Sequence, residues 1–406
     1  MINVIGLGYI GLPTALMLAA NGNSVIGTDC NRQLIYKLKN GELTFEEKGM
    51  ESIFHEAERN NISFTTEYME AGTYIISVPT PYDRKTKKVD AAYIISAVRS
   101  VCRVCMRGAV LIIESTIPPG TIDRSVRPAI ESEGLIIGED LHIVHAPERI
   151  IPGNMMYELV HNSRTIGADK KEIGEQVKQI YGTFCKGEIV VTDVRTAEMT
   201  KVAENTYRDI NIAFANELAK ICRSDNLDVY EIIRIANKHP RVDILCPGPG
   251  VGGHCISVDP WFLIGDYPGL ANLILAARKI NNSMPEFVLE RIRVIMDEHN
   301  ISELSRVGLY GLTYKEDVDD IRESPTLQML ESMRNHLACG IKIYDPFIKE
   351  DIVPNQYHKF ESFIEDIDLV VIMVGHSEIK QKLSLLNDKI ILDTKNICPF
   401  PGTYKL

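Results

Sequence analysis

The first 29 residues carry the pattern that most constrains the fold. A short run rich in β-branched residues, Ile2–Ile5, leads into glycines with the spacing G-x-G-x-x-G. A helix-forming apolar segment and a second apolar run over residues 24–28 follow, and Asp29 comes 18 residues after the third glycine. The order strand, glycine turn, helix, strand and acid predicts a parallel α/β unit with a phosphate-binding turn.

The same pattern predicts a dinucleotide site. The first glycine allows a tight turn, the second lets the backbone approach a pyrophosphate, and the third lets helix and strand pack closely. Phosphates would lie at the helix N-terminus, where N–H groups and the helix dipole favour anions. Asp29 would accept hydrogen bonds from the adenosine ribose and repel a 2′-phosphate, so NAD is favoured over NADP. A glycine turn in a non-binding α/β unit is the alternative. The turn residues expected to contact the cofactor are Gly6, Gly8, Tyr9, Ile10 and Gly11.

Three further apolar runs end in loops rich in proline, threonine, serine or glutamate. They cover residues 73–78, 109–113 and 141–145. Ligands of parallel sheets bind outside the carboxyl ends of the strands, so these loops are candidate walls of a site. In chain order they contribute Pro79, Thr80, Thr116, Glu148 and Arg149.

The middle of the chain differs from the start. Residues 196–223 contain no glycine or proline and place apolar side chains near helical spacing, which predicts one long helix. Further helices are predicted over residues 228–237 and 270–281. Long helices of this kind often form dimer contacts, so we expect a homodimer through the central helices.

The C-terminal part repeats the N-terminal order. Residues 306–311 are a predicted strand running into glycine, and residues 341–345 are a predicted strand ending in an acid. The glycine turn lacks the full fingerprint, so a mononucleotide fits better here than a second dinucleotide. The expected class is α/β, with two Rossmann-like doubly wound parallel-sheet domains joined by a long-helix central segment. The expected boundaries are 1–194, 195–300 and 301–406.

The segment 247–259 is the most unusual of the chain. Four glycines and two prolines precede Cys255, and glycines such as Gly252 let the backbone approach a ligand closely. A cysteine behind such a loop can be held near a substrate carbon, where its thiolate is a nucleophile. A buried structural cysteine is the alternative.

A metal site is the rival interpretation of this segment, because Cys246, His254, Cys255 and Asp259 are close in sequence. No C-x-x-C pair with zinc-finger spacing accompanies them, so we predict no metal. The pair Cys102 and Cys105 falls in a predicted helix and is expected to be structural.

Several polar residues are further candidates. Lys201 and Asn205 are four apart and share a face of the long helix, although a solvated surface would have the same spacing. Arg241 precedes the glycine loop and could reach a phosphate or carboxylate. Lys315 and Arg322 are the basic pair that a phosphate ligand needs, but neighbouring acids also allow plain salt bridges.

The composition limits the classes of partner and the location that we expect for the protein. The net charge of −11 argues against nucleic acid and anionic membranes as partners, but a local site can still bind a small anion. The nine cysteines do not resemble a disulfide framework, so a cytoplasmic location is expected. The uncharged first 28 residues lack a positive region and are interrupted by polar residues, so they resemble neither a signal peptide nor a membrane span.

Taken together, these motifs resemble those of the nucleotide-sugar 6-dehydrogenases, the family that includes UDP-glucose dehydrogenase. The resemblance covers essentially the whole chain. The residues that carry it are, in order, Gly6-Leu7-Gly8-Tyr9-Ile10-Gly11-Leu12-Pro13, Val78-Pro79-Thr80-Pro81, Glu114-Ser115-Thr116, Pro147-Glu148-Arg149, Glu204-Asn205-Thr206, Gly252-Gly253-His254-Cys255 and Lys315 through Arg322-Glu323-Ser324-Pro325.

The resemblance implies a four-electron oxidation of the sugar C6 alcohol to a carboxylate with two NAD. Cys255 would attack the aldehyde to give a thiohemiacetal, which the second oxidation converts to a thioester. Lys201, or a water held by Asp259, would be the base for the alcohol. A water activated near Glu148 or Asp259 would hydrolyse the thioester, and Lys201 and Asn205 would stabilise the oxyanion.

The resemblance also implies ligand contacts. Lys315 would contact UDP, Arg322 the cofactor, and Thr116 both the cofactor and the reacting groups. His239 and Arg241 are candidate substrate contacts across a subunit boundary. The full set of expected substrate contacts is Glu148, Arg149, Lys201, Asn205, Arg208, His239, Arg241, Gly252 and Lys315.

Within the family, the residues most resemble the branch that acts on UDP-N-acetyl-D-mannosamine. His254 and Val258 stand where UDP-glucose enzymes usually carry Ser and Lys, so a UDP-N-acetylhexosamine substrate is expected. The same chemistry on UDP-N-acetylglucosamine or another UDP-hexose is the alternative. A two-electron dehydrogenase would not need the cysteine, and a silent regulator that binds NAD and UDP-sugar would not need the reactive residues. The family suggests a pathway to surface polysaccharide.

Overall fold

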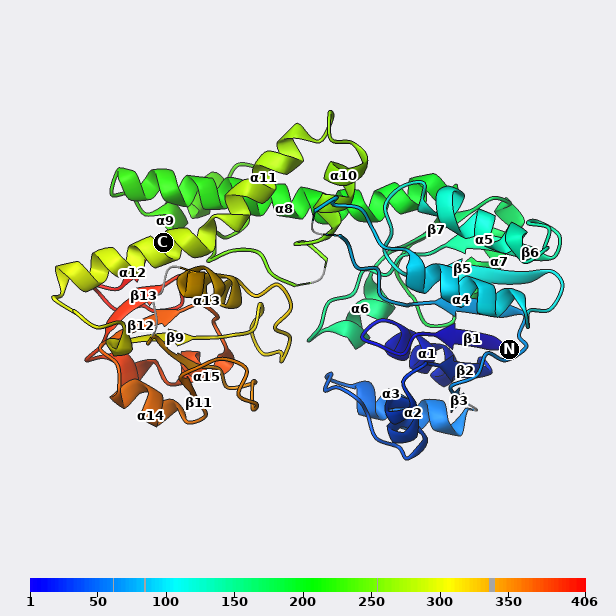
Figure 1. The fold of residues 1–406 in the computed structure, drawn as a ribbon, viewed down its shortest axis with the longest axis horizontal. Coiled ribbons are helices and arrows are strands. Elements are labelled where there is room, and N and C mark those ends of the chain that lie inside the picture. Colours follow the sequence, from blue (N-terminus) through cyan, green and yellow to red (C-terminus); the bar gives the residue numbers. More distant parts are fainter. Residues whose placement is uncertain (61, 84, 254, 336–339) are drawn as a thin grey trace. The chain divides into compact units, whose positions relative to one another are not determined.

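The computed structural model describes residues 1–406 except 61, 84, 254 and 336–339. The chain divides into two compact units, Met1–Glu204 and Asn205–Leu406, and each is described by itself. Each unit contains one sheet of mainly parallel strands with helices on both faces (Figure 1). The predicted doubly wound α/β class is therefore confirmed, whereas the three-part division of the chain stays a prediction.

The sheet of the first unit has eight strands in the order β3-β2-β1-β4-β5-β6-β7-β8. Neighbouring strands are parallel except for β6 and β7, an antiparallel pair that the sequence did not indicate. After β6 the chain passes through one short helix and enters β7 from the carboxyl end of β6, so β7 runs back beside β6. The strands are β1 (Ile2–Ile5), β2 (Val25–Thr28), β3 (Ile62–Thr65), β4 (Thr73–Ile76), β5 (Ala109–Ile113), β6 (Leu141–His145), β7 (Arg164–Ala168) and β8 (Ile189–Thr192).

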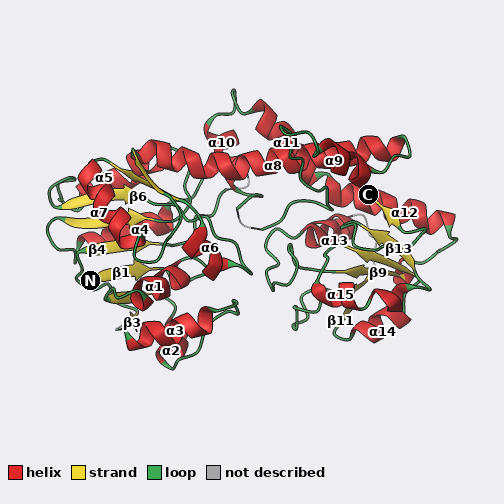
Figure 2. Ribbon diagram, turned by 180° about the vertical axis from the view of Figure 1, so that it is seen from behind, coloured by secondary structure: helices red, strands yellow, loops and turns green. Residues whose placement is uncertain are grey.

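Helices cover both faces of this sheet (Figure 2). Val110 and Ile112 of β5 pack on one layer and Leu111 and Ile113 on the other, as expected for a strand that is buried on both faces. The first layer contains α1 (Gly11–Ala20), α2 (Arg32–Lys39), α3 (Met50–Arg59), α6 (Met155–His161) and α7 (Lys171–Tyr181), and the second contains α4 (Ala92–Cys102), the π-helical turn η1 (Ile122–Val126) and α5 (Arg127–Ser132).

The glycine turn after β1 is as tight as the sequence predicts. Gly6 has a φ of 86°, and its N–H donates to the carbonyl of Thr28 over 2.8 Å. A Cβ atom on Gly11 would lie 1.8 Å from the carbonyl oxygen of Gly6, and one on Gly6 would lie 2.6 Å from that of Ser77. Only glycine fits at these two positions without moving the backbone of the turn.

The second unit repeats this topology. Its sheet has the order β11-β10-β9-β12-β13-β14 and is parallel throughout. In chain order this is the arrangement of the first six strands of the first unit, so the predicted internal repeat is present. The strands are β9 (Val307–Tyr310), β10 (Lys342–Tyr344), β11 (Gln356–Tyr357), β12 (Leu369–Ile372), β13 (Ile390–Asp393) and β14 (Tyr404–Lys405).

The predicted long helix is α8 (Val194–Ser224), which has 31 residues. With α9 (Val229–Ala236), α12 (Met284–Glu298) and α13 (Pro325–Asn335) its C-terminal part packs on one face of the second sheet. The helices α14 (Phe360–Glu365) and α15 (Ser377–Gln381) pack on the other face. The remaining helical segments of this unit are α10 (Asp259–Asp266), α11 (Asn272–Asn282), η2 (Leu304–Arg306) and η3 (Leu383–Leu386).

Buried polar side chains of α8 hold the neighbouring segments of the second unit. Asp209 accepts hydrogen bonds from Arg278 at 2.6 Å and from Asn281 at 2.7 Å, both on α11. Asn216 donates to Asn281 over 2.9 Å and accepts from the N–H of Gly248 over 2.9 Å. One helix therefore positions both α11 and the start of the glycine-rich loop.

A buried charged cluster lies at the carboxyl end of β5 in the first unit. Glu114 accepts hydrogen bonds from Ser77 at 2.5 Å and from Tyr181 at 3.1 Å. The guanidinium of Arg164 pairs with Glu148 and lies 3.7 Å from Glu114, so one cation faces two carboxyl groups. Burial, followed by the charge of Glu148, raises the pKa of the Glu114 carboxyl from its ordinary 4.5 to about 7.

Replacing Glu114 by Gln should reduce the pH dependence of stability. Because the pKa of Glu114 is raised in the folded state, the folded chain binds more protons than the unfolded chain between about pH 4.5 and 7. The free energy of unfolding should therefore fall by about 1–3 kcal/mol as the pH rises through this range, and E114Q should lack that fall. Urea denaturation at pH 5, 6 and 8 measures it.

The exposed Glu56 of α3 provides the control, because Glu56→Gln changes the same charge without changing the cluster. Its unfolding free energy should follow the wild-type pH profile. Identical profiles for E114Q and the wild type would contradict the prediction.

Candidate functional site

The start of α1 is open to an anion. Gly8 is exposed, and a Cβ atom placed on it would have nothing within 4 Å among the described residues. In the part of the chain that the structure describes, no side chain caps α1 at Ile10, and its first turn carries no acid. The first N–H groups of the helix can therefore bind a pyrophosphate.

Asp29 lies directly after β2 and is half-buried. Its Oδ2 accepts a hydrogen bond from the N–H of Leu7, and its Oδ1 one from the N–H of Asn31, both at 2.8 Å. These bonds fix the carboxylate beside the glycine turn, and each oxygen retains a further lone pair for a ribose hydroxyl. The turn and the acid together fit NAD, whose nicotinamide ring accepts a hydride when it is bound.

The loops after β4 and β5 lie together. Ser115 donates to the carbonyl of Val78 over 2.7 Å, which joins the two loops. Pro79 is exposed, Thr80 is buried and Thr116 is half-buried. These predicted site residues thus lie at adjacent strand ends of one sheet.

Glu148 and Arg149 are both held within the first unit. Besides its pairing with Arg164, Glu148 accepts a hydrogen bond from the N–H of Arg149 at 2.6 Å. The guanidinium of Arg149 contacts Glu204 at 2.6 Å and Thr165 at 2.9 Å. Both oxygens of Glu148 are engaged, so its catalytic role stays a prediction that has to be reconciled with a buried ion pair.

Arg164 of this cluster was missed in the sequence analysis. Its strand, β7, was not predicted, although an arginine at the start of an apolar run is a usable signal. Its guanidinium lies 4.3 Å from the ring centre of Tyr181, so it is stacked as well as paired.

Lys201 and Asn205 lie on a buried face of α8. They are 6% and 5% exposed, so a solvated helix surface, the alternative left open by their spacing, is excluded. Asn205 donates to Oδ2 of the buried Asp259 over 2.6 Å. Two of the predicted catalytic residues are therefore in direct contact.

Cys255 is half-buried and lies one turn before α10. Its carbonyl accepts hydrogen bonds from the N–H groups of Val258 at 3.1 Å and Asp259 at 2.9 Å. The same Asp259 thus connects the cysteine backbone with Asn205 of α8. The predicted candidate His254 lies outside the described residues.

The glycine-rich loop packs on the loop after β9. The N–H of Gly253 donates to the carbonyl of Arg322 over 2.8 Å. A Cβ atom on Gly252 would lie 2.5 Å from Cβ of Tyr314, and one on Gly253 would lie 2.8 Å from the Tyr314 ring. Tyr314 is a contact that the sequence analysis missed, and its place directly before Lys315 was the available signal.

Lys315 and Arg322 lie on the loop between β9 and α13, as predicted. The guanidinium of Arg322 pairs with Asp320 at 2.6 Å, so the salt bridge that the sequence allowed is formed. His239, Arg241 and Arg208 are exposed, and within the described residues no hydrogen bond or ion pair joins them to the other candidates.

The two cysteines of the C-x-x-C motif are structural. The helix α4 ends at Cys102, so Cys105 lies in the following turn rather than in the predicted helix. Burial raises the pKa of the Cys102 thiol to about 12 and also raises that of Cys105, so neither is a ready nucleophile. Among the described residues, no group of three His, Cys, Asp or Glu side chains is arranged to hold a metal ion.

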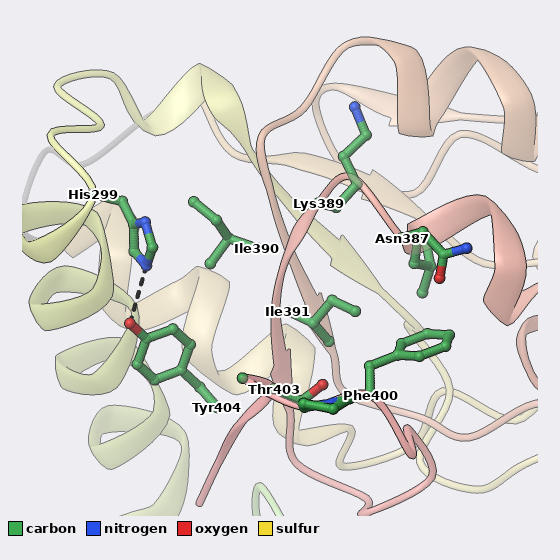
Figure 3. A pocket seen from close by; sticks show the side chains of 11 residues that line it. His299, Asn387, Lys389, Ile390, Ile391, Phe400, Thr403 and Tyr404 are labelled. Atoms are coloured by element: carbon green, nitrogen blue, oxygen red, sulfur yellow. Dashed lines mark hydrogen bonds between the residues drawn. The ribbon is translucent and has the colours of Figure 1, made fainter.

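One cavity of about 620 Å³ lies elsewhere in the second unit, at the amino ends of β13 and β14 (Figure 3). His299 and Tyr404, hydrogen-bonded at 2.9 Å, line it together with Lys389 and Phe400. Nucleotides bind at the carboxyl ends of parallel strands, and none of the predicted site residues lines this cavity.

Within the described ranges, no helix is long and apolar enough to cross a bilayer.

Three segments match the UDP-glucose/GDP-mannose dehydrogenase family. Residues 1–185 match its NAD binding domain, residues 195–283 its central domain and residues 308–399 its UDP binding domain.

Full-length relatives agree with this match. The UDP-N-acetyl-D-mannosamine dehydrogenase of Methanocaldococcus jannaschii is 43% identical over 407 residues, covering 97% of this chain and 92% of that protein. The structure of the UDP-N-acetyl-mannosamine dehydrogenase Cap5O from Staphylococcus aureus is 43% identical with a TM-score of 0.89, covering 100% of this chain and 98% of that one. The UDP-D-ManNAc dehydrogenase structure from Pyrococcus horikoshii is 37% identical with a TM-score of 0.92 and the same coverage. The chain therefore belongs to the UDP-glucose/GDP-mannose dehydrogenase family and is an NAD-dependent nucleotide-sugar dehydrogenase.

Proposed function

We propose that the protein oxidises UDP-N-acetyl-D-mannosamine at C6 to UDP-N-acetyl-D-mannosaminuronate for surface polysaccharide synthesis. The names of its full-length relatives support this substrate. The observation that carries the chemistry is the placement of Cys255, one turn before α10, behind a glycine loop packed on the loop of Lys315. The loop that presents the nucleophile thus touches the loop expected to bind the nucleotide.

The steps up to the thioester involve four residues of the enzyme. Lys201, or a water held by Asp259, takes the proton of the C6 alcohol as the first hydride leaves. The thiolate of Cys255 then adds to the aldehyde carbon, and Lys201 and Asn205 stabilise the resulting oxyanion. Loss of the second hydride converts this thiohemiacetal to a thioester.

Water then releases the acid and regenerates the thiol. Asp259 is held by Asn205 at 2.6 Å, and Glu148 is held by Arg164 and the N–H of Arg149. Either carboxylate is a candidate to orient the water. Glu148 would have to share an oxygen with its ion pair to do so.

A second copy of the chain is the proposed partner, through α8. Tyr207, Phe214 and Ile221 are spaced by seven residues and are 64%, 53% and 55% exposed. An apolar stripe with this spacing is typical of helices that pack against another helix. In such a dimer the exposed His239 and Arg241 are available to contact the substrate of the other copy.

The cysteine content supports a cytoplasmic enzyme.

The protein should form two NADH per sugar. Purified protein with excess NAD and limiting UDP-N-acetyl-D-mannosamine should double the NADH expected of a simple alcohol dehydrogenase, because the oxidation removes four electrons. Absorbance at a fixed sugar concentration measures the ratio. UDP-N-acetylglucosamine and UDP-glucose in parallel reactions test the substrate. Two NADH from another sugar alone would overturn the substrate assignment, and one NADH per sugar would overturn the thioester step.

Replacing Cys255 by Ser should abolish acid formation. Serine does not form the thioester, so turnover should fall at least 1,000-fold, while UDP and NAD still bind. Product analysis by mass spectrometry measures this loss. Cys246→Ser is the matched control, since Cys246 is exposed and nine residues upstream. Wild-type turnover in C255S would contradict the mechanism with a thioester on Cys255.

Replacing Phe214 by Glu should weaken the dimer. A charge in the middle of the apolar stripe opposes its burial against another copy, so the dimer dissociation constant should rise at least tenfold. Analytical ultracentrifugation measures it. Gln179→Glu adds the same charge on the exposed side of α7 and should leave the dimer unchanged. Equal association of F214E and the wild type would place the interface elsewhere.

A further inference from the structure

The second unit retains the acid of the first glycine turn. Asp345 directly follows β10, as Asp29 directly follows β2. Its Oδ2 accepts from the N–H of Leu312, next to the turn glycine, at 2.6 Å, and its Oδ1 accepts from the N–H of Phe347 at 2.8 Å. Asp29 accepts from the corresponding two backbone groups. The two halves thus build the same turn.

The surroundings of the two acids differ. Asp29 is half-buried, whereas Asp345 is buried beneath the side chain of His376, which is itself fully buried. Nε2 of His376, from the segment after β12, lies 3.3 Å from Oδ2 of Asp345. The imidazole therefore covers Oδ2 of Asp345, whereas the half-buried Asp29 stays partly open to a ribose hydroxyl.

The same imidazole holds the following loop. Its Nδ1 accepts a hydrogen bond from the N–H of Asp317 at 2.9 Å, which requires a neutral ring with the proton on Nε2. Nε2 also lies 3.3 Å from Oγ1 of Thr313, and that hydroxyl donates to the carbonyl of Lys315 at 2.9 Å. One side chain thus contacts the loop on both sides of Lys315.

The conformation of this loop depends on such contacts. Asp317 has a φ of 56°, where residues other than glycine are rarely found. Its carboxylate accepts from the N–H of Ser377 at 2.8 Å, and Lys380 pairs with Glu316 at 2.6 Å. The segment 376–380 therefore contacts the loop at and beside its left-handed residue, where such contacts offset the backbone strain.

The loop also supports the reactive segment. Tyr314 lies against Gly252 and Gly253, and the carbonyl of Arg322 accepts the N–H of Gly253. A displacement of the loop at Thr313 or Asp317 would be transmitted to the glycines that precede Cys255.

We propose that His376 is the positioning residue of the nucleotide loop, residues 311–324 between β9 and α13. Its imidazole substitutes for a ribose hydroxyl at Asp345 and holds Thr313 to Asp317 so that Lys315 meets a uridine diphosphate. The identity of that ligand rests on the proposed function. Because the loop packs on Gly252 and Gly253, the same residue stabilises the position of the Cys255 loop.

The test is His376→Ala in the full-length protein. Calorimetry with UDP should show binding at least tenfold weaker than in the wild type, while NAD binding should change less than twofold. The KM for the UDP-sugar should rise more than kcat falls. Free imidazole should restore part of the UDP affinity, which a general loss of stability would not allow. Trypsin should cleave after Lys315 faster than in the wild type.

His145→Ala is the matched control. His145 is also fully buried, at the end of β6 in the first unit, with Nδ1 2.9 Å from the carbonyl of Ile113. It should lose stability without changing UDP affinity or cleavage after Lys315. If H376A does not fold, His376→Phe replaces it, because its ring fills the buried space but cannot accept from the N–H of Asp317.

The outcomes separate this inference from the proposed function. A wild-type protein that binds no UDP would refute the proposed function, and cleavage after Lys315 would then decide the loop role alone. A folded H376A or H376F with UDP affinity within twofold of the wild type, or with unchanged cleavage, would overturn the role of His376.

Discussion

The close approach of backbone to backbone at the end of the first strand determines how each half of the chain is built. In the first unit, a Cβ atom on Gly11 would lie only 1.8 Å from the carbonyl oxygen of Gly6, so the helix can begin this close to the turn because Gly11 has no side chain. In the second unit, a Cβ atom on Gly311 would lie 2.9 Å from the backbone nitrogen of Val374. Each turn is locked by an acid at the end of the neighbouring strand. This constraint places the loops after the other parallel strands around one edge of each sheet, where ligands bind.

The same turn has two outcomes because the chain continues differently after it. In the first unit, α1 begins at Gly11, so its free N–H groups lie beside the turn and fit a pyrophosphate. In the second unit, a long loop precedes α13, and His376 fills the space at Asp345. The second half therefore loses the ribose site of a dinucleotide and gains a shaped loop, consistent with its match to a UDP binding domain.

The sequence predicted well what depends on local chemistry. The strand runs and the glycines were located because apolar periodicity and left-handed backbone angles leave signals in neighbouring residues. It predicted less well what depends on tertiary contacts. The apolar spacing of residues 196–223 does not separate the buried side of α8 from the side of Phe214, which is exposed, because α8 carries apolar residues on two sides. The pairing of Glu148 with Arg164 joins two strand ends, and no spacing in the sequence connects them.

The position of the cysteine depends on contacts from both of its flanks. On one side, α8 holds the glycine loop through Asn216 and the start of α10 through Asn205. On the other side, the nucleotide loop contacts Gly253 through the carbonyl of Arg322. Catalysis requires the reacting atoms to be positioned closely, so small shifts of either support reduce the rate. On the proposed function, ordering of the nucleotide loop by the diphosphate would also order Cys255, the proposed nucleophile, and so would couple recognition of the nucleotide to the proposed chemistry at C6 of the sugar.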